Sequence, residues 1–243
     1  MLFCSAQGVV DRVWNIPTNT TIILPEIGGW LLGDRLYHTG MVGGLWDVQT
    51  KEWKGPRILS NVNVGFVRDN WIVYTDETGI GVLDVSSNLQ FHTVANPLHG
   101  QSPILWHEYA VWIEWGNSED KVILWNWRED IKQDIFAHKP ISLQSNTREL
   151  WWLETDTIRQ WNGHVVQSIN AQGVHSLSVA DDIACWSALG EKDLDIHCST
   201  GEVFERVGNQ TFPQVYMSVW DANDKKNIFF MEEQQIFRII FSE

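Results

Sequence analysis

Four carboxylates stand at the same place in a recurring pattern, where each closes a run of apolar and aromatic residues: Asp76, Glu114, Glu154 and Glu232. Three histidines stand in segments between such runs: His99, His138 and His175. Carboxylates and imidazoles bind catalytic zinc ions and are the commonest general acids and bases near neutral pH. If the fold brings the two sets together, they could bind a metal ion or form an acid–base pair.

A tryptophan extends this set. Trp115 directly follows Glu114 in the polar segment 114–120, where no neighbouring strand is expected to cover its ring. The candidate binding cluster is therefore Asp76, His99, Glu114, Trp115, His138, Glu154, His175 and Glu232. A simpler interpretation stands beside it. The histidines would hydrogen-bond neighbouring loops, and the carboxylates would be solvated turn residues.

Signatures of catalysis are absent from the sequence. It has no Gly-x-Ser-x-Gly elbow, no glycine-rich phosphate loop, no His-Glu-x-x-His and no calcium loop of alternating acids. We therefore assign no catalytic residue, no metal ligand and no cofactor.

The candidate binding cluster must be positioned by β-strands, because the sequence pattern around it is typical of strands. Runs rich in Val, Ile, Trp, Tyr and Phe alternate with clusters of Gly, Asp, Asn and Pro about every 8–12 residues, and helical periodicity is nearly absent. Several runs end in an apolar or aromatic residue followed by Asp or Asn: Trp14-Asn15, Trp46-Asp47, Leu83-Asp84, Trp125-Asn126 and Trp161-Asn162. Their spacing of about 37 residues lies in the range of propellers and solenoids. The chain is predicted to be all-β.

A second strand precedes each of these runs, at 3–6, 37–40, 73–76, 111–114, 151–154, 185–188 and 229–232. A further strand is expected before most of these pairs, and a more polar strand after most of them. Each repeat is therefore predicted to be a sheet of three to four antiparallel strands.

On these segments the sequence resembles the TolB-like and WD-repeat β-propellers, and TolB more closely. Segments 28–37 and 67–74 are similar to the degenerate repeat of that family, although the Ser-Pro-Asp-Gly of TolB repeats and the Gly-His of WD repeats are missing. The resemblance spans nearly the whole chain. It implies that the loops after the second strands and the links between blades open together at the mouth of a central channel, which would assemble the cluster.

The resemblance implies a single β-propeller domain over residues 1–243, most simply with seven short blades. The approximate repeats are 1–25, 26–55, 56–97, 98–137, 138–171, 172–209 and 210–243. A ring of six blades, in which the two terminal pieces merge into one blade, is the alternative.

The 15 tryptophans divide into two groups. Seven fall in two aligned columns and are predicted to fill the core between blades: Trp14, Trp46, Trp112, Trp125, Trp152, Trp161 and Trp186. The other eight are candidates for ring platforms that bind sugars or a cation: Trp30, Trp53, Trp71, Trp106, Trp115, Trp127, Trp151 and Trp220.

Charge and cysteine content constrain partner and compartment. The net charge of −14 disfavours nucleic acid and anionic membranes and suits a basic partner. We find no basic leader and no apolar stretch long enough to span a bilayer, so a cytoplasmic protein is expected. The three cysteines show no Cys-x-x-Cys spacing and fit neither a disulfide framework nor a zinc site. Cys185 and Cys198 are interpreted as small, buried apolar residues.

These observations favour a non-catalytic binding or scaffold propeller that docks a protein or peptide partner on its acidic channel-mouth face. Two alternatives remain open from the sequence. One is a lectin-like propeller that binds carbohydrate, and the other is a polysaccharide lyase or hydrolase that uses a metal at the channel mouth.

Overall fold

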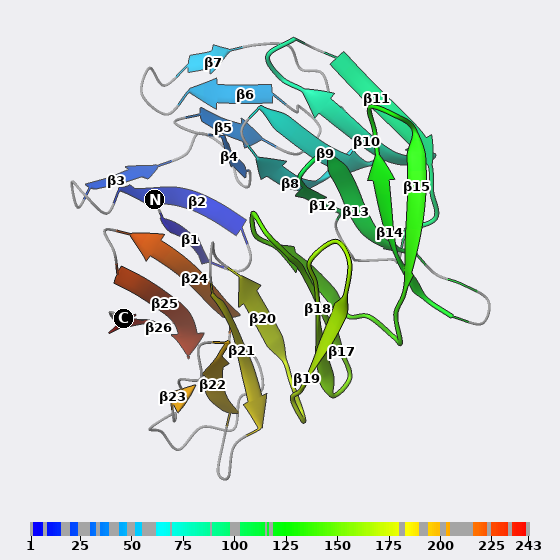
Figure 1. The fold of residues 1–243 in the computed structure, drawn as a ribbon. Helices are drawn as coiled ribbons and strands as arrows, with labels where there is room; N and C mark the ends of the chain where they lie inside the picture. Colours follow the sequence, from blue (N-terminus) through cyan, green and yellow to red (C-terminus); the bar gives the residue numbers. More distant parts are fainter. Residues whose placement is uncertain are drawn as a thin grey trace. The chain divides into compact units, whose positions relative to one another are not determined.

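The computed structural model describes residues 62–68, 70–87, 89–97, 103–114, 116, 119–179, 183–189 and 194–199, and outside these ranges it describes the backbone of the strands. The chain divides into two compact units, Met1–Asn96 and Pro97–Glu243. All regular secondary structure among the described residues is β-strand, which confirms the all-β prediction (Figure 1). Within the described part of the chain, no helix is long and apolar enough to cross a lipid bilayer.

In the first unit the described strands form three antiparallel sheets. The first sheet contains β1 (Leu2–Ala6), β2 (Val9–Asn15) and β3 (Thr20–Ile23). The second contains β4 (Trp30–Leu32), β5 (Arg35–His38), β6 (Gly44–Asp47) and β7 (Glu52–Lys54). The third contains β8 (Asn63–Arg68), β9 (Trp71–Thr75), β10 (Gly79–Asp84) and β11 (Leu89–Val94).

In the second unit the described strands form four antiparallel sheets. The first contains β12 (Ile104–Trp106), β13 (Tyr109–Glu114), β14 (Lys121–Asn126) and β15 (Ile131–Phe136). The second contains β16 (Ser142–Ser145), β17 (Leu150–Glu154), β18 (Thr157–Trp161) and β19 (Val166–Asn170). The third contains β20 (Ser176–Val179), β21 (Ala184–Leu189), β22 (Leu194–Cys198) and β23 (Val203–Phe204). The fourth contains β24 (Tyr216–Ala222), β25 (Lys225–Glu232) and β26 (Gln235–Phe241).

Each sheet is a meander in which every strand pairs with the strand that follows it in the chain, as Figure 1 shows. The prediction of three to four antiparallel strands per repeat is therefore confirmed. The second and third strands β9, β10, β13, β14 and β17 are mostly buried, as is the first strand β12, and the fourth strands β11 and β19 are largely exposed. Near-continuous apolar runs thus place the inner strands in the core, and the polar fourth strands form the exposed edge.

The predicted core tryptophans with described side chains are buried: Trp112, Trp125, Trp152, Trp161 and Trp186. Trp14 and Trp46 lie outside the described side chains. Side chains of β17 and β18 pack against those of β20 and β21 in one apolar cluster that includes Trp151, Leu153, Leu177 and Trp186. Stacking of one sheet on the next therefore explains why large flat rings recur at these places.

Three of the tryptophans outside the columns are also buried. Trp106, Trp127 and Trp151 expose 5%, 4% and 2% of their surface, so the prediction that they could be open ring platforms is wrong. Trp71 is half-buried. The remaining candidates lie outside the described side chains: Trp30, Trp53, Trp115 and Trp220.

Polar side chains start the turn from the third strand to the fourth. Asn126, the last residue of β14, accepts hydrogen bonds from the backbone N–H groups two and three residues later, at 3.1 and 3.2 Å. Asn162, directly after β18, accepts the same two bonds at 3.1 Å each. Asp84 accepts the first of them at 2.9 Å. The Asp or Asn that marks the sequence repeat therefore forms the turn in place of backbone partners.

Asn126 is buried and Asn162 is exposed, so the two turn residues can be compared in a matched test. We expect Asn126→Ala to lower the free energy of unfolding by about 1–2 kcal/mol, because Asn126 is buried and its loss leaves two N–H groups without an acceptor. Asn162→Ala removes the same pair of bonds at an exposed position and should cost less than about 1 kcal/mol. Urea unfolding of both variants measures the difference, and equal losses would contradict the role of burial.

Candidate functional site

The eight predicted site residues fall into two groups: some have described side chains, and the side chains of the others lie outside the described part of the chain. Glu114 and Glu154 end the second strands β13 and β17, and Asp76 follows the second strand β9. We call these three residues, with Glu232 at the end of β25, the strand-end carboxylates. The side chain of Glu232 lies outside the described side chains, and His99 and Trp115 lie outside the described residues.

Glu154 is a buried carboxylate with three hydrogen-bond donors around it. One of its oxygens accepts from the Trp152 indole Nε1 at 3.1 Å and from the backbone N–H of His138 at 3.0 Å. The other oxygen accepts from Arg159 Nε at 3.0 Å, which makes an ion pair across β17 and β18. His138 belongs to the segment that arrives from the preceding sheet, so this carboxylate joins two sheets. Its donors are all internal, which makes Glu154 a structural residue.

Asp76 stabilises the turn between β9 and β10. Its Oδ1 accepts from the backbone N–H groups of Thr78 and Gly79 at 2.8 and 3.0 Å, and from the Thr78 hydroxyl at 2.8 Å. His92 Nε2 lies 3.1 Å from the other oxygen. Burial tends to raise the pKa of Asp76, but the hydrogen bonds from Thr78 and His92 outweigh it and lower the pKa below its usual 3.8. Asp76 is therefore ionised at neutral pH.

Glu114 is half-buried and pairs in register with Lys121 across β13 and β14. Its backbone also forms an isolated bridge with Pro97, in the segment that precedes β12. Lys121 bonds to Asp134 at 2.5 Å, and this contact raises the pKa of the lysine, with smaller contributions from Glu119 and Glu114. In both β13 and β17, the strand-end carboxylate thus marks the place where the incoming segment meets the sheet.

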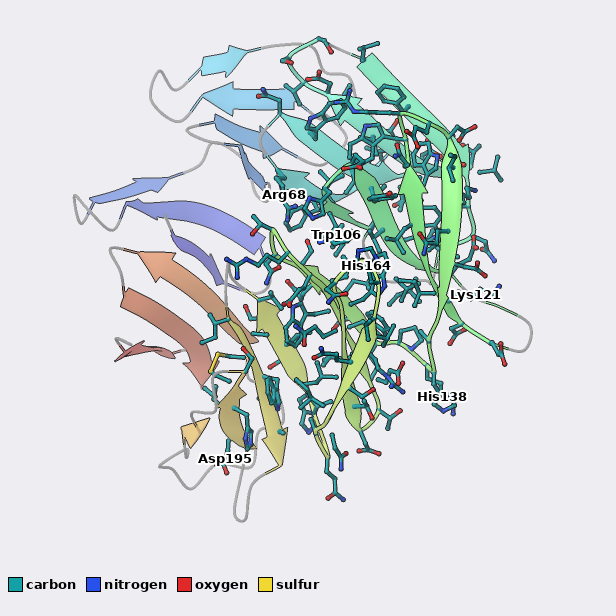
Figure 2. All side chains as sticks on the ribbon, in the orientation of Figure 1. Arg68, Trp106, Lys121, His138, His164 and Asp195 are labelled. Carbon is teal, nitrogen blue, oxygen red and sulfur yellow. A yellow bond between two sulfur atoms is a disulfide. The ribbon has the colours of Figure 1, made fainter. Side chains whose placement is uncertain are left out.

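Of the predicted site histidines, the two that the structure describes, His138 and His175, do not contact the strand-end carboxylates through their rings, whereas His92, which was not predicted, contacts Asp76 through its Nε2. His138 is exposed, and Figure 2 shows its ring projecting from the segment after β15. His175 is exposed as well, and its backbone N–H donates to the Ser187 carbonyl at 2.9 Å. Among the described residues, no group of three His, Cys, Asp or Glu side chains is placed to hold a metal ion. The structure therefore brings His138 and Glu154 together only through the histidine backbone.

A different set of carboxylates is exposed. Each lies in the turn between the second and third strands of its own sheet, shortly after a strand-end carboxylate: Glu77, Glu119 and Asp156. We call these the turn carboxylates. The sequence analysis missed them because it aligned strand ends, although the polar turns that follow those ends were visible in the same alignment.

In the second unit, two turn carboxylates lie at the same end of adjacent sheets. The strand register places Glu114, Lys121 and Phe136 at one end of sheet β12–β15, where the β13–β14 turn carries Glu119. The chain leaves that end after Phe136 and reaches Glu154 through the His138 N–H. Asp156 lies two residues beyond Glu154, in the β17–β18 turn. The register and this hydrogen bond therefore put Glu119 and Asp156 on one edge of the unit.

The structure also corrects the interpretation of two cysteines. Cys185 on β21 and Cys198 on β22 are directly opposed in the strand register and form a disulfide, drawn as a yellow bond in Figure 2. Segment 185–188 was predicted as a second strand, and pairing it with the strand that follows places the two cysteines opposite each other.

Comparison with known proteins identifies the fold and not the family. No protein-family model matches the chain, and no curated protein matches it. The extracellular domain of a putative one-component system, BT4673 of B. thetaiotaomicron, is similar with a TM-score of 0.60 at 13% identity, over 87% of this chain and 32% of that chain. PorZ, a surface component of the type-IX secretion system of Porphyromonas gingivalis, gives 0.58 at 11%, over 96% and 37%.

TolB of Acinetobacter baumannii gives a TM-score of 0.51 at 12% identity, over 79% of this chain and 57% of that chain. The chain therefore spans about a third of the first two proteins and little more than half of TolB. Similarity at this level of identity concerns the fold alone. Together with the repeated antiparallel sheets, it supports a β-propeller-like fold and the expected likeness to TolB.

Loss of the Glu154 carboxylate should destabilise the chain more than loss of Glu114. We expect Glu154→Ala to lower the free energy of unfolding by about 2–4 kcal/mol, because the buried Trp152 indole N–H and the His138 backbone N–H lose their acceptor while the half-exposed Arg159 can turn to solvent. Glu154→Gln keeps an acceptor and should cost less. Glu114→Ala, at the equivalent half-buried position, is the matched control. Urea unfolding with a Glu154→Ala loss no larger than that of Glu114→Ala would contradict this assignment.

Proposed function

We propose that the chain is a non-catalytic binding or scaffold propeller that docks a basic protein or peptide on the edge of the second unit formed by the turns between second and third strands. The observation that carries this proposal is the exposure of the turn carboxylates Glu119 and Asp156 at equivalent positions of two adjacent sheets of that unit. The net charge of −14 supports the same partner chemistry.

The strand-end carboxylates Asp76 and Glu154 are engaged by several internal donors, whereas the exposed Asp156 accepts one hydrogen bond, from the Gly173 N–H at 3.2 Å, and this difference supports the proposal. Glu154 and Asp76 use their oxygens for internal donors, so they leave little capacity for a ligand. The same contacts hold the turns in place, because the Asp76 carboxylate orders the turn that carries Glu77, and Glu154 ends the strand that leads to Asp156. Exposed charges on ordered turns lose little conformational entropy when a partner binds.

The arrangement in the second unit gives the proposal a defined surface. Glu119 and Asp156 lie on one edge of adjacent sheets, and Asp120 is a half-buried neighbour of Glu119. Attraction between this acidic edge and a basic partner accelerates association and weakens with salt.

Charge reversal tests the surface against matched controls. We expect Glu119→Lys and Asp156→Lys to weaken binding of a synthetic Lys/Ser peptide about 3- to 10-fold each in low salt, as measured by fluorescence anisotropy. Glu108→Lys and Glu129→Lys make the same charge change in exposed turns at the opposite end of sheet β12–β15 and should leave binding within about 2-fold of wild type.

The salt dependence provides the contradicting outcome. Binding of the same peptide should fall steeply between about 50 and 500 mM NaCl. A Kd that is equal at both salt concentrations, or that changes equally in all four variants, would contradict the proposal of an acidic docking face. The burial of Trp106, Trp127 and Trp151 gives no support to the carbohydrate-binding alternative.

We further propose that the sheets are seven blades of one propeller domain over residues 1–243. The proposal is supported by the seven sheets formed by the described strands and by the coverage of propeller-like structures. An experimental structure with six sheets around the axis would contradict it.

A further inference from the structure

The register of β21 and β22 places Cys185 and Cys198 directly opposite each other. One position further, just beyond β22, the Ser199 N–H donates to the Ala184 carbonyl at 2.8 Å and the Ala184 N–H donates to the Ser199 Oγ at 3.1 Å, so Ala184 and Ser199 close this end of the pairing by hydrogen bonds. In an antiparallel ladder, opposed side chains lie closest in the non-hydrogen-bonded pairs, which have the shorter Cα–Cα separation. The Cα atoms of Cys185 and Cys198 are 4.1 Å apart, as in such a pair.

The disulfide lies in the interior of the second unit. Cys185 and Cys198 expose 0% and 4% of their surface. Ala184, Trp186 and Ala188 belong to the apolar cluster shared with β17 and β18, so Cys185 faces the other side of the sheet, because successive side chains alternate. On the described backbone, β20 and β21 also contact β24. A thiol-reactive reagent can therefore reach the sulfurs only when this part of the structure opens.

We propose that the Cys185–Cys198 disulfide is an integral part of the native protein and that the chain matures in an oxidising compartment, not in the cytosol expected from the sequence. Disulfides persist in oxidising environments and are rare where glutathione and thioredoxin keep thiols reduced. This inference does not depend on the proposed docking function.

The Cys185–Cys198 bond can form by thiol–disulfide exchange with an oxidant that itself carries a disulfide. A thiolate of Cys185 or Cys198 attacks the disulfide of that oxidant, and one thiol of the oxidant leaves. The second cysteine then attacks the mixed disulfide and releases the other thiol. Two thiols of the chain are oxidised by two electrons, and the oxidant ends as two thiols. Cys4 takes no part in this pair and remains the third cysteine.

Physical consequences follow from the position of the crosslink. It closes a loop with a sequence separation of 13, which reduces the conformational freedom of the unfolded chain. It also ties the second strand of sheet β20–β23 to the third. Its loss should therefore weaken this sheet first. Burial should protect the bond from reductants in the folded state.

Thiol counting is the direct test. Full-length protein produced through a secretory route is unfolded and alkylated with iodoacetamide, with and without prior reduction, and the mass is measured. We expect one alkylated cysteine without reduction and three after it, since the chain has three cysteines. Three alkylated cysteines without reduction would overturn the proposal. A peptide map that links Cys4 to either partner would overturn it as well.

Stability provides the second test, with a matched cysteine control. We expect Cys185→Ala/Cys198→Ala to lower Tm by roughly 5–10 °C and to lose its response to dithiothreitol. Cys4→Ala should keep both the wild-type response to reductant and a Tm close to that of wild type. A double variant with wild-type Tm would overturn the structural role of the bond.

Hydrogen exchange separates a local effect from general unfolding. On reduction of the wild-type protein, amides of β21 and β22 should exchange several-fold faster, whereas those of β13 and β14 should change little. The experiment needs no variant, so it remains decisive if the double variant does not fold. Equal protection of β21 and β22 before and after complete reduction would contradict the proposal.

Discussion

Burial of the Glu154 carboxylate is the constraint on which the described part of the second unit depends. A carboxylate in the interior needs hydrogen-bond donors for its oxygens, and here they come from β17, from β18 and from the segment that enters from the preceding sheet. Those donors can meet only if the strand register, the turn after β17 and the link between sheets are all correct. A single carboxylate thus couples local hairpin geometry to the stacking of one sheet on the next.

The strand-end carboxylates also show that a residue repeated at equivalent positions can have a structural role. A periodic carboxylate in a repeat protein suggests a ligand site, because repeats place equivalent residues in equivalent positions. In this chain, periodicity at the strand ends reports a structural need instead: Asp76 orders a turn, and Glu154 anchors an incoming segment. The exposed charges lie a few residues further on, in turns whose lengths differ. Of these, Asp156 also accepts the Gly173 N–H at 3.2 Å, so an exposed turn carboxylate can still contact the segment that leads to the next sheet.

The sequence predicted the strands and the turn residues well, and the side-chain environments less well. Asn126 and Asn162 were found by spacing, since an Asx turn needs a specific residue at a specific place. Burial of Trp106 and Trp151 was not predicted, because alternation along a strand shows which residues share a face but not whether another sheet covers that face. The Glu154–Arg159 pair was missed for a related reason. It depends on a diagonal across two strands, which a column alignment of single strands cannot show.

Neighbouring sheets stabilise equivalent strand pairs by different chemistry. Sheet β16–β19 joins its second and third strands through the partly buried Glu154–Arg159 ion pair, and sheet β20–β23 joins its second and third strands through the buried Cys185–Cys198 disulfide. Sheet β12–β15 has an exposed Lys121–Asp134 pair between its third and fourth strands. Sheets with the same strand order are therefore joined by different pairs of side chains. This is consistent with a regular backbone repeat and a degenerate sequence signature, because packing fixes the strand register and several pairs of side chains can satisfy it.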